Sequence, residues 1–212
     1  FRKAAQWKNH RAQYYLAEFY YKGYIVDKDL KTAFDWYVMA ANGGDELAIK
    51  ALLNRFSHTF ITGVSRDACL NCFKLLAEKG VAEAQYEAGY LYEHYSADKS
   101  NALYWYQVAC DNGNKDAMFT MAEYYLEEQK DRRNAVRWFS KAAALGHIKA
   151  RVHLTKLFYD YYHDVDKAYD NAVLALDAIE MDDGADVGYL NFILGNISYF
   201  YKKGENYLEK AM

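Results

Sequence analysis

Histidines and paired carboxylates are the residues of this chain whose types could carry acid–base or metal chemistry. Four histidines fall in different segments: His58, His94, His147 and His153. His147 and His153 are six residues apart, a spacing that does not place both on one helical face. Acidic pairs such as Glu127-Glu128 fall where we expect helices to end, so solvation explains them better than catalysis. The sequence also has no Gly-rich phosphate loop, GxSxG elbow or HExxH motif, and we expect no enzyme and no catalytic residue.

The cysteines are the other candidates for chemistry. Cys69 and Cys72 are three residues apart on one expected helix, and Cys110 is distant from them in the sequence. An odd number of cysteines does not resemble a disulfide-stapled secreted domain. Two cysteines make no zinc site without a further cluster of ligands. We therefore expect buried or half-buried free thiols, no metal site and no cofactor. Reduced thiols slightly favour the cytoplasm, but the localisation stays open.

The amino-acid composition limits the fold classes that can position these residues. Hydrophobic residues make up 52 % of the 212 residues and charged residues 26 %, which is not the composition of a disordered tail. The net charge of −3 argues against a nucleic-acid binder with a broad basic surface. The absence of proline argues against β-sandwiches and favours long helices. No stretch of 18 apolar residues predicts a membrane span.

A segment of one type recurs five times along the chain. It reads Ala, three residues, an apolar residue, a small residue, two residues and an aromatic residue, as in Ala12–Leu16–Ala17–Tyr20. The leading alanines are 36, 36, 33 and 33 residues apart: Ala12, Ala48, Ala84, Ala117 and Ala150. Most of the pattern positions are three or four residues apart, so each segment predicts a helix with one apolar face, which we call helix A.

A second segment, helix B, alternates with the first and reads Ala, two residues, Trp, an aromatic residue, two residues, Ala. Its clearest copies begin at Ala33, Ala102 and Ala135. An aspartate precedes four of the helix B segments by four residues and predicts an N-cap: Asp29, Asp98, Asp131 and Asp164. A glycine precedes four of the helix A segments in the same way and predicts a left-handed turn: Gly44, Gly80, Gly113 and Gly146.

A helix pair of this length cannot bury its apolar face alone, so the pairs must stack. Small residues such as Ala17, Gly89 and Ala122 let helix B approach helix A closely, and we expect Trp105 to be buried between repeats three and four. The sequence therefore predicts an all-α, right-handed superhelical solenoid of antiparallel helix pairs with no β-sheet.

These motifs resemble the Sel1-like repeat family, a relative of the tetratricopeptide repeats. The features that carry the resemblance are the aromatic pairs Trp36-Tyr37, Trp105-Tyr106 and Trp138-Phe139, the alanine pairs Ala40-Ala41 and Ala142-Ala143, and the glycines before four of the helix A segments. The resemblance covers essentially the whole chain as one array. Its parts are a partial repeat at 1–9, repeats near 10–45, 46–81, 82–114, 115–147 and 148–185, and a partial repeat at 186–212. Both ends resemble helix B segments, so we expect a fragment of a longer chain.

By resemblance to tetratricopeptide geometry, helix A lines the concave inside of the superhelix. The inward positions give these partner-binding candidates: Tyr14, Glu18, Tyr21, Lys50, His58, Tyr86, Tyr90, Glu93, Phe119, Glu123, Glu127, Lys156 and Tyr159. The middle of this groove also carries Glu83 and Asp116 and is acidic, so the hypothesis is a protein or peptide partner with a basic segment.

Three function classes remain open at this point. The resemblance implies a non-enzymatic adaptor or scaffold that binds a protein or peptide in the concave groove. The alternative is an inhibitor or immunity-type protein that blocks a partner enzyme. An RNA-binding helical array is the third, and the net charge and acidic groove count against it.

Overall fold

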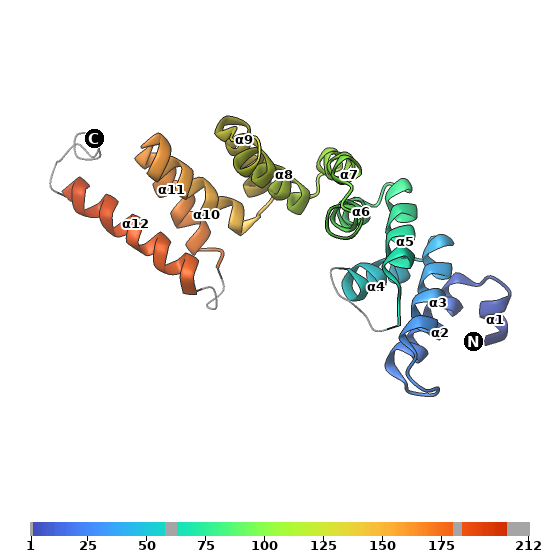
Figure 1. Cartoon of the computed structure of the whole chain (residues 1–212). Helices are drawn as coiled ribbons and strands as arrows, with labels where there is room; N and C mark the ends of the chain where they lie inside the picture. Colours follow the sequence, from blue (N-terminus) through green and yellow to red (C-terminus); the bar gives the residue numbers. More distant parts are fainter. Residues whose placement is uncertain (1, 58–62, 180–183, 203–212) are drawn as a thin grey trace. The chain divides into compact units, whose positions relative to one another are not determined.

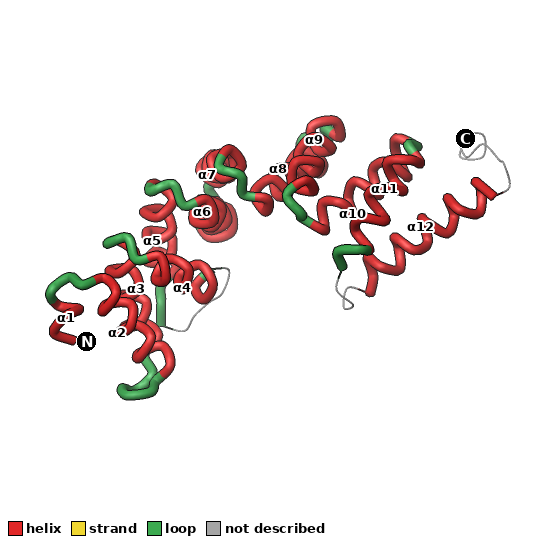
Figure 2. Tube along the Cα trace, turned by 180° about the vertical axis from the view of Figure 1, so that it is seen from behind, coloured by secondary structure: helices red, strands yellow, loops and turns green. Residues whose placement is uncertain are grey.

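The computed structural model describes residues 2–57, 63–179 and 184–202, and these residues form helices and connecting loops with no strand among them (Figures 1 and 2). The chain divides into two compact units, Phe1–Asn114 and Lys115–Met212, and the division falls between the third and fourth repeats. The all-α fold of helix pairs is confirmed.

The first unit holds a short first helix and three helix pairs. The helices are α1 (Arg2–Gln6), α2 (His10–Lys22), α3 (Leu30–Asn42), α4 (Glu46–Phe56), α5 (Arg66–Glu78), α6 (Ala82–Tyr95) and α7 (Lys99–Asp111). Each pair packs on the next, and one continuous core runs from Ala17 on α2 to Trp105 on α7. The interior is built mostly from alanines and aromatic residues, as the repeated pattern predicts.

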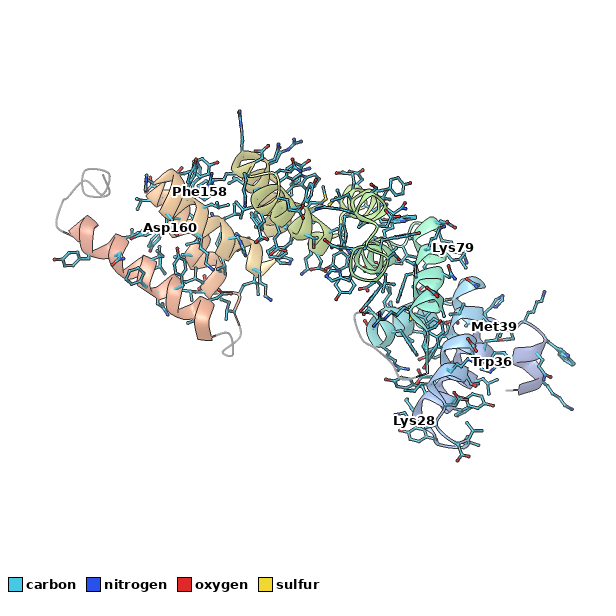
Figure 3. The ribbon with its side chains drawn as sticks, in the orientation of Figure 1. Lys28, Trp36, Met39, Lys79, Phe158 and Asp160 are labelled. Carbon is cyan, nitrogen blue, oxygen red and sulfur yellow. The ribbon has the colours of Figure 1, made fainter. Side chains whose placement is uncertain are left out.

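The second unit holds two helix pairs and one further helix. The elements are α8 (Lys115–Glu127), α9 (Arg132–Ala144), α10 (Ile148–Lys156), the π-helical turn η1 (Leu157–Tyr162), α11 (Val165–Leu176) and α12 (Gly184–Lys202). Phe158 and Asp160 lie on η1, which continues α10 directly (Figure 3). The α12 helix packs on α11 through Ile193, Ile197 and Leu190, which are almost fully buried.

Local signals set the helix boundaries. Each of the five helix A elements begins two residues before its leading alanine. Each of the four aspartates predicted as N-caps accepts a hydrogen bond from the backbone N–H three residues later: Asp29, Asp98, Asp131 and Asp164. The four predicted glycine turns have φ between +79° and +88°, a region where L side chains are strained. These predictions are confirmed.

Gly89 permits a close approach of helix B to helix A in the third repeat. A Cβ atom at Gly89 would lie 2.7 Å from the ring of Tyr106 and 3.2 Å from the carbonyl oxygen of Ala102. Tyr106 is buried, so the ring has little room to move away.

We expect Gly89→Ala to lower the free energy of unfolding by about 1–2 kcal/mol, because overpacking outweighs the better helix propensity of alanine. Gly195→Ala on α12 is the matched control, since a Cβ there meets nothing within 4 Å. That change should instead stabilise by about 0.5–1 kcal/mol. Urea unfolding of both variants checks the contrast, and equal shifts in the same direction would contradict the close contact at Gly89.

Candidate functional site

The structure places the groove candidates on the first helices of the pairs, with one continuing onto η1. Tyr14, Glu18 and Tyr21 lie on α2, Lys50 on α4, and Tyr86, Tyr90 and Glu93 on α6, all in the first unit. Phe119, Glu123 and Glu127 lie on α8, Lys156 on α10 and Tyr159 on η1, all in the second unit. His58 lies outside the described residues. The face of each unit is therefore considered by itself.

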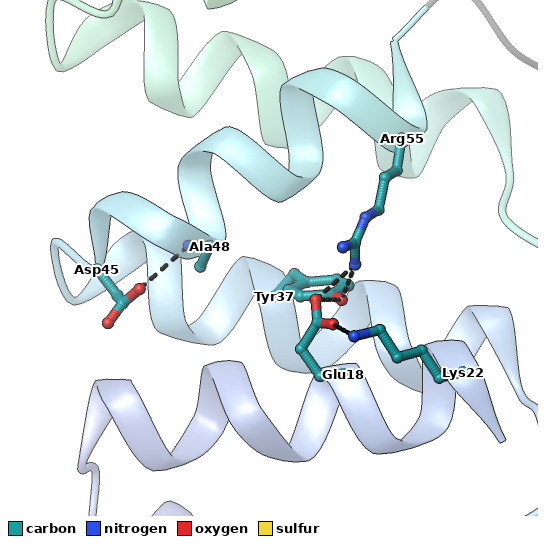
Figure 4. Close-up of polar contacts among 6 residues, drawn as sticks. All are labelled: Glu18, Lys22, Tyr37, Asp45, Ala48 and Arg55. Atoms are coloured by element: carbon teal, nitrogen blue, oxygen red, sulfur yellow. Dashed lines mark hydrogen bonds and ion pairs between the residues drawn. The ribbon is translucent and has the colours of Figure 1, made fainter. Parts of the chain in front are cut away.

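Glu18 lies at the centre of a polar cluster that joins three helices of the first unit (Figure 4). The Tyr37 hydroxyl donates to Glu18 Oε1 at 2.6 Å, and Arg55 Nη1 donates to the same oxygen at 2.5 Å. Arg55 also donates to the Tyr37 hydroxyl oxygen, and Lys22 Nζ lies 3.0 Å from Glu18 Oε2. Glu18 is only 8 % exposed, so packing already uses the carboxylate that the sequence pattern assigned to partner binding.

The electrostatics of this cluster favour the ionised carboxylate. Burial by itself raises the pKa of Glu18, but hydrogen bonds from Tyr37, Arg55 and Lys22 outweigh it and leave the pKa below its ordinary value. Arg55 also stacks over the ring of Tyr21, with its Cζ 4.3 Å from the ring centroid. The cluster therefore binds repeat one to repeat two, and Tyr21 helps to hold it.

The exposed face of α6 is acidic and aromatic. The helix carries Glu83, Glu87 and Glu93 and no lysine or arginine. Glu83 is exposed in its first turn, whereas Glu93 accepts a hydrogen bond from the Tyr106 hydroxyl at 2.8 Å. The pKa of Tyr106 is raised by burial and then by this bond, so the hydroxyl stays protonated and keeps donating.

Aromatic rings cover the rest of the same helix. The Tyr90 ring stacks on His94 with centroids 4.1 Å apart, and Tyr86 packs against Tyr106 at 5.7 Å. Tyr86 and Tyr90 are half-buried, so each supports the fold and still presents part of its ring to solvent. Glutamates beside partly exposed tyrosines suit cationic side chains, through ion pairs and cation–π contacts.

In the second unit, Phe119 lies between two histidines. Its ring stacks on His147 at 4.4 Å and meets His153 edge-on at 5.4 Å, while His153 also stacks on Phe139 at 4.9 Å. Burial lowers the pKa of both histidines, so the neutral rings are favoured here. The spacing of His147 and His153 in the sequence does not predict this cluster, because His147 is the N-cap of α10 and not a residue of the helix. Its Nδ1 accepts a hydrogen bond from the backbone N–H of Ala150 at 3.1 Å.

The last groove candidates tie α12 to the preceding repeat. Lys156 Nζ lies 3.8 Å from Asp186 Oδ1, and the amide of Asn196 donates to the Tyr159 hydroxyl at 3.2 Å. The Tyr189 hydroxyl donates to Asp160 at 2.9 Å. Lys156 and Tyr159 thus have partners within the second unit, and the sequence pattern alone did not reveal these contacts.

Among the residues that the structure describes, no group of three or more His, Cys, Asp or Glu side chains could hold a metal ion. Cys72 and Cys110 are buried, Cys69 is half-buried, and none of the three forms a disulfide in the described part of the chain. Burial raises the pKa of Cys72 to about 12, which suppresses its thiolate. Among the described helices, none is long and apolar enough to cross a membrane.

Stacked α/α pairs with capped helices and close glycine contacts define a helical repeat protein. The family model for the Sel1 repeat matches residues 10–45, 82–114 and 115–147. These are the first, third and fourth repeats, so the chain contains three Sel1 repeats. Sel1 repeat folds typically mediate protein–protein interactions, and the family is generally a non-enzymatic interaction scaffold.

Solved structures share the fold. A protective antigen present in uropathogenic Escherichia coli strains, which displays an SLR fold, is 26 % identical with a TM-score of 0.69, and the match covers 97 % of this chain and 44 % of the antigen. The chain thus spans less than half of that protein. A Sel1 repeat protein from Oxalobacter formigenes is 25 % identical with a TM-score of 0.61, and the match covers 93 % and 89 %. A Pseudomonas aeruginosa protein at 17 % identity shares the fold with a TM-score of 0.53, covering 92 % and 81 %. No curated protein matches the chain significantly.

Proposed function

We propose that this protein is a non-enzymatic adaptor that holds a protein or peptide partner on the helix A faces of its repeats. The observation that carries the proposal is the α6 face, where exposed charge and partly exposed rings remain after packing is complete. The interaction role typical of the Sel1 repeat supports it. Two further groove candidates, Lys50 in the first unit and Glu127 in the second, are exposed and add charge to the helix A faces.

The chemistry of α6 favours a basic segment on the partner. Glu83 and Glu93 supply negative charge, and Tyr86 and Tyr90 supply ring faces for lysine or arginine side chains. Tyrosine also gives large contact area at low cost in side-chain entropy. A partner loop or helix with spaced cations would thus find both attraction and area on one helix.

Glu83→Lys is expected to weaken binding of a basic peptide at least tenfold and to reduce the salt dependence of its association rate, because it reverses the one α6 glutamate that is exposed in the first turn. The measurement is a titration with three labelled peptides of equal length: one basic, one acidic and one uncharged. Only the basic peptide should bind this face.

Glu46→Lys is the matched control. Glu46 is also exposed in the first turn of a helix A, so the change has the same effect on net charge and on the helix dipole. The control should bind the basic peptide like the unaltered protein. Equal loss in both variants would show a general charge effect, and an unchanged affinity in Glu83→Lys would rule out the α6 face.

A further inference from the structure

A stripe of three cations runs along the solvent side of α9. Arg133, Arg137 and Lys141 are four residues apart in turn, and all three are exposed. The spacing places them on one face, about 6 Å apart along the helix axis. The opposite face holds the core residues: Ala135, Trp138, Phe139, Ala142 and Ala143. We call these three residues the α9 stripe.

The α9 helix itself supplies no acid to the stripe. The α9 helix carries four cations, including Arg132, and no aspartate or glutamate, whereas α3, α5, α7 and α11 each carry both signs. Within the described residues, none of the stripe side chains forms a salt bridge. The nearest acid in sequence, Asp131, is the N-cap: its carboxylate accepts hydrogen bonds from Asn134, and the charge of Arg133 interacts with it more weakly.

The fold uses Lys141, whose Nζ lies 4.1 Å from the centroid of the Trp138 ring in the last turn of the helix, but it gains little from Arg133 and Arg137. Like charges four residues apart repel each other on a helix, and cations in the first turn oppose the helix dipole. The other second helices satisfy the same core pattern without such a stripe. Arg133 and Arg137 form no salt bridge or cation–π contact among the described residues, and an external partner of opposite sign accounts for their charge.

Exposed aromatic rings lie beside Arg132, the first residue of α9. The guanidinium of Arg132 lies over the Tyr161 ring, with its Cζ 4.1 Å from the centroid. Tyr161 is 51 % exposed and meets the ring of Tyr162, itself 42 % exposed, at 5.1 Å. Both tyrosines lie on η1, and π-helical turns are rare and frequent at functional sites. Arginine and tyrosine are the side chains that dominate protein–protein binding energy.

We propose that the α9 stripe binds an acidic segment of a partner protein. Carboxylates four residues apart on a partner helix match the spacing of the stripe, and each guanidinium can bind a carboxylate through two parallel hydrogen bonds. The stripe is only about 12 Å long, and the chain is acidic overall, which favours a short acidic segment over a nucleic acid. This surface is separate from the α6 face and takes a partner of opposite charge.

The test pairs two double variants of equal charge change. Arg133→Gln with Arg137→Gln should weaken binding of a helical peptide with glutamate at every fourth position at least tenfold, and flatten its salt dependence. Lys31→Gln with Lys74→Gln removes two exposed cations from other second helices and should leave the affinity unchanged. The peptide with glutamine in place of glutamate should not bind. The Arg133→Gln, Arg137→Gln double variant, which we call the stripe variant, should have a melting temperature no lower than that of the unaltered protein. A loss of binding then cannot be attributed to unfolding.

Other occupants give distinct results. Tighter binding of single-stranded RNA or of phosphatidylserine vesicles than of the acidic peptide, lost in the stripe variant, would overturn the protein partner. Self-association in sedimentation that the stripe variant abolishes would instead assign the stripe to a second copy of this chain. Equal affinity of both double variants for the acidic peptide would overturn the site altogether. The stripe variant should bind the basic peptide on α6 as the unaltered protein does. The proposal for the α6 face and the proposal for the α9 stripe can therefore fail independently.

Discussion

Trp105→Ala is expected to lower the free energy of unfolding by about 3–5 kcal/mol. Trp105 lies on α7, is 8 % exposed and belongs to the core of the first unit. It occupies the repeat position that Trp138 holds on α9, which is also buried. Removal of the indole loses the apolar transfer energy and leaves a cavity between helices that backbone packing cannot close. Urea unfolding followed by circular dichroism measures the change.

Trp7→Ala is the control for Trp105→Ala, because it makes the same substitution at a side chain that is 84 % exposed. Its expected effect is within about 0.5 kcal/mol. A Trp105→Ala variant that unfolds at the urea concentration of the control would show that α7 is rotated away from the core.

Helix boundaries follow from the sequence because their signals are local. Asp29 needs only the amide of Thr32, three residues later, and Gly80 needs only its own φ of +86°. Close helix approach is readable for a related reason: Gly89 has no Cβ, and the ring of Tyr106 occupies that space. The repeat supplies several copies of each signal, so a single degenerate copy does not obscure the pattern.

The contacts that decide the site are not local and were missed. Arg55 reaches Glu18 across 37 residues and Tyr37 across 18, and the contact depends on the rotamers of three helices. The position of Glu18 in the repeat predicts the direction of its side chain and places it in the groove. That position does not predict which side chains it contacts. The π-helical turn at Leu157–Tyr162 was also missed, since its sequence continues the helix A pattern through Phe158.

The contrast between repeats also separates structural from functional charge. Glu18 and Arg55 are both ionised, yet each is satisfied by the other. Arg133 and Arg137 form no salt bridge among the described residues, and the same is true of Glu83. A charge that packing leaves uncompensated is therefore the more informative sign of a partner, and it can be recognised only after the internal pairs are known.

Arg55→Met is expected to lower the free energy of unfolding by about 2–4 kcal/mol, because it leaves the Glu18 carboxylate buried without its guanidinium. Lys22→Met is the control on the same carboxylate and should cost less than about 1 kcal/mol, since Lys22 is 44 % exposed. The double variant with Glu18→Gln should recover part of the loss, because the remaining amide carries no charge. The resulting coupling energy, about 1–3 kcal/mol, measures the pair.

The same cluster makes stability depend on pH with a defined sign. The pKa of Glu18 is lower in the folded protein than in the unfolded chain, so the unfolded state binds the proton more tightly. The stabilisation is complete above the unfolded pKa of about 4.3 and is lost as the pH falls through the folded pKa. Glu18→Gln should remove this part of the acid-induced loss, whereas Lys22→Met should retain most of it. Parallel pH profiles for Glu18→Gln and the unaltered protein, measured by urea unfolding, would show that Glu18 is not the ionised centre of the cluster.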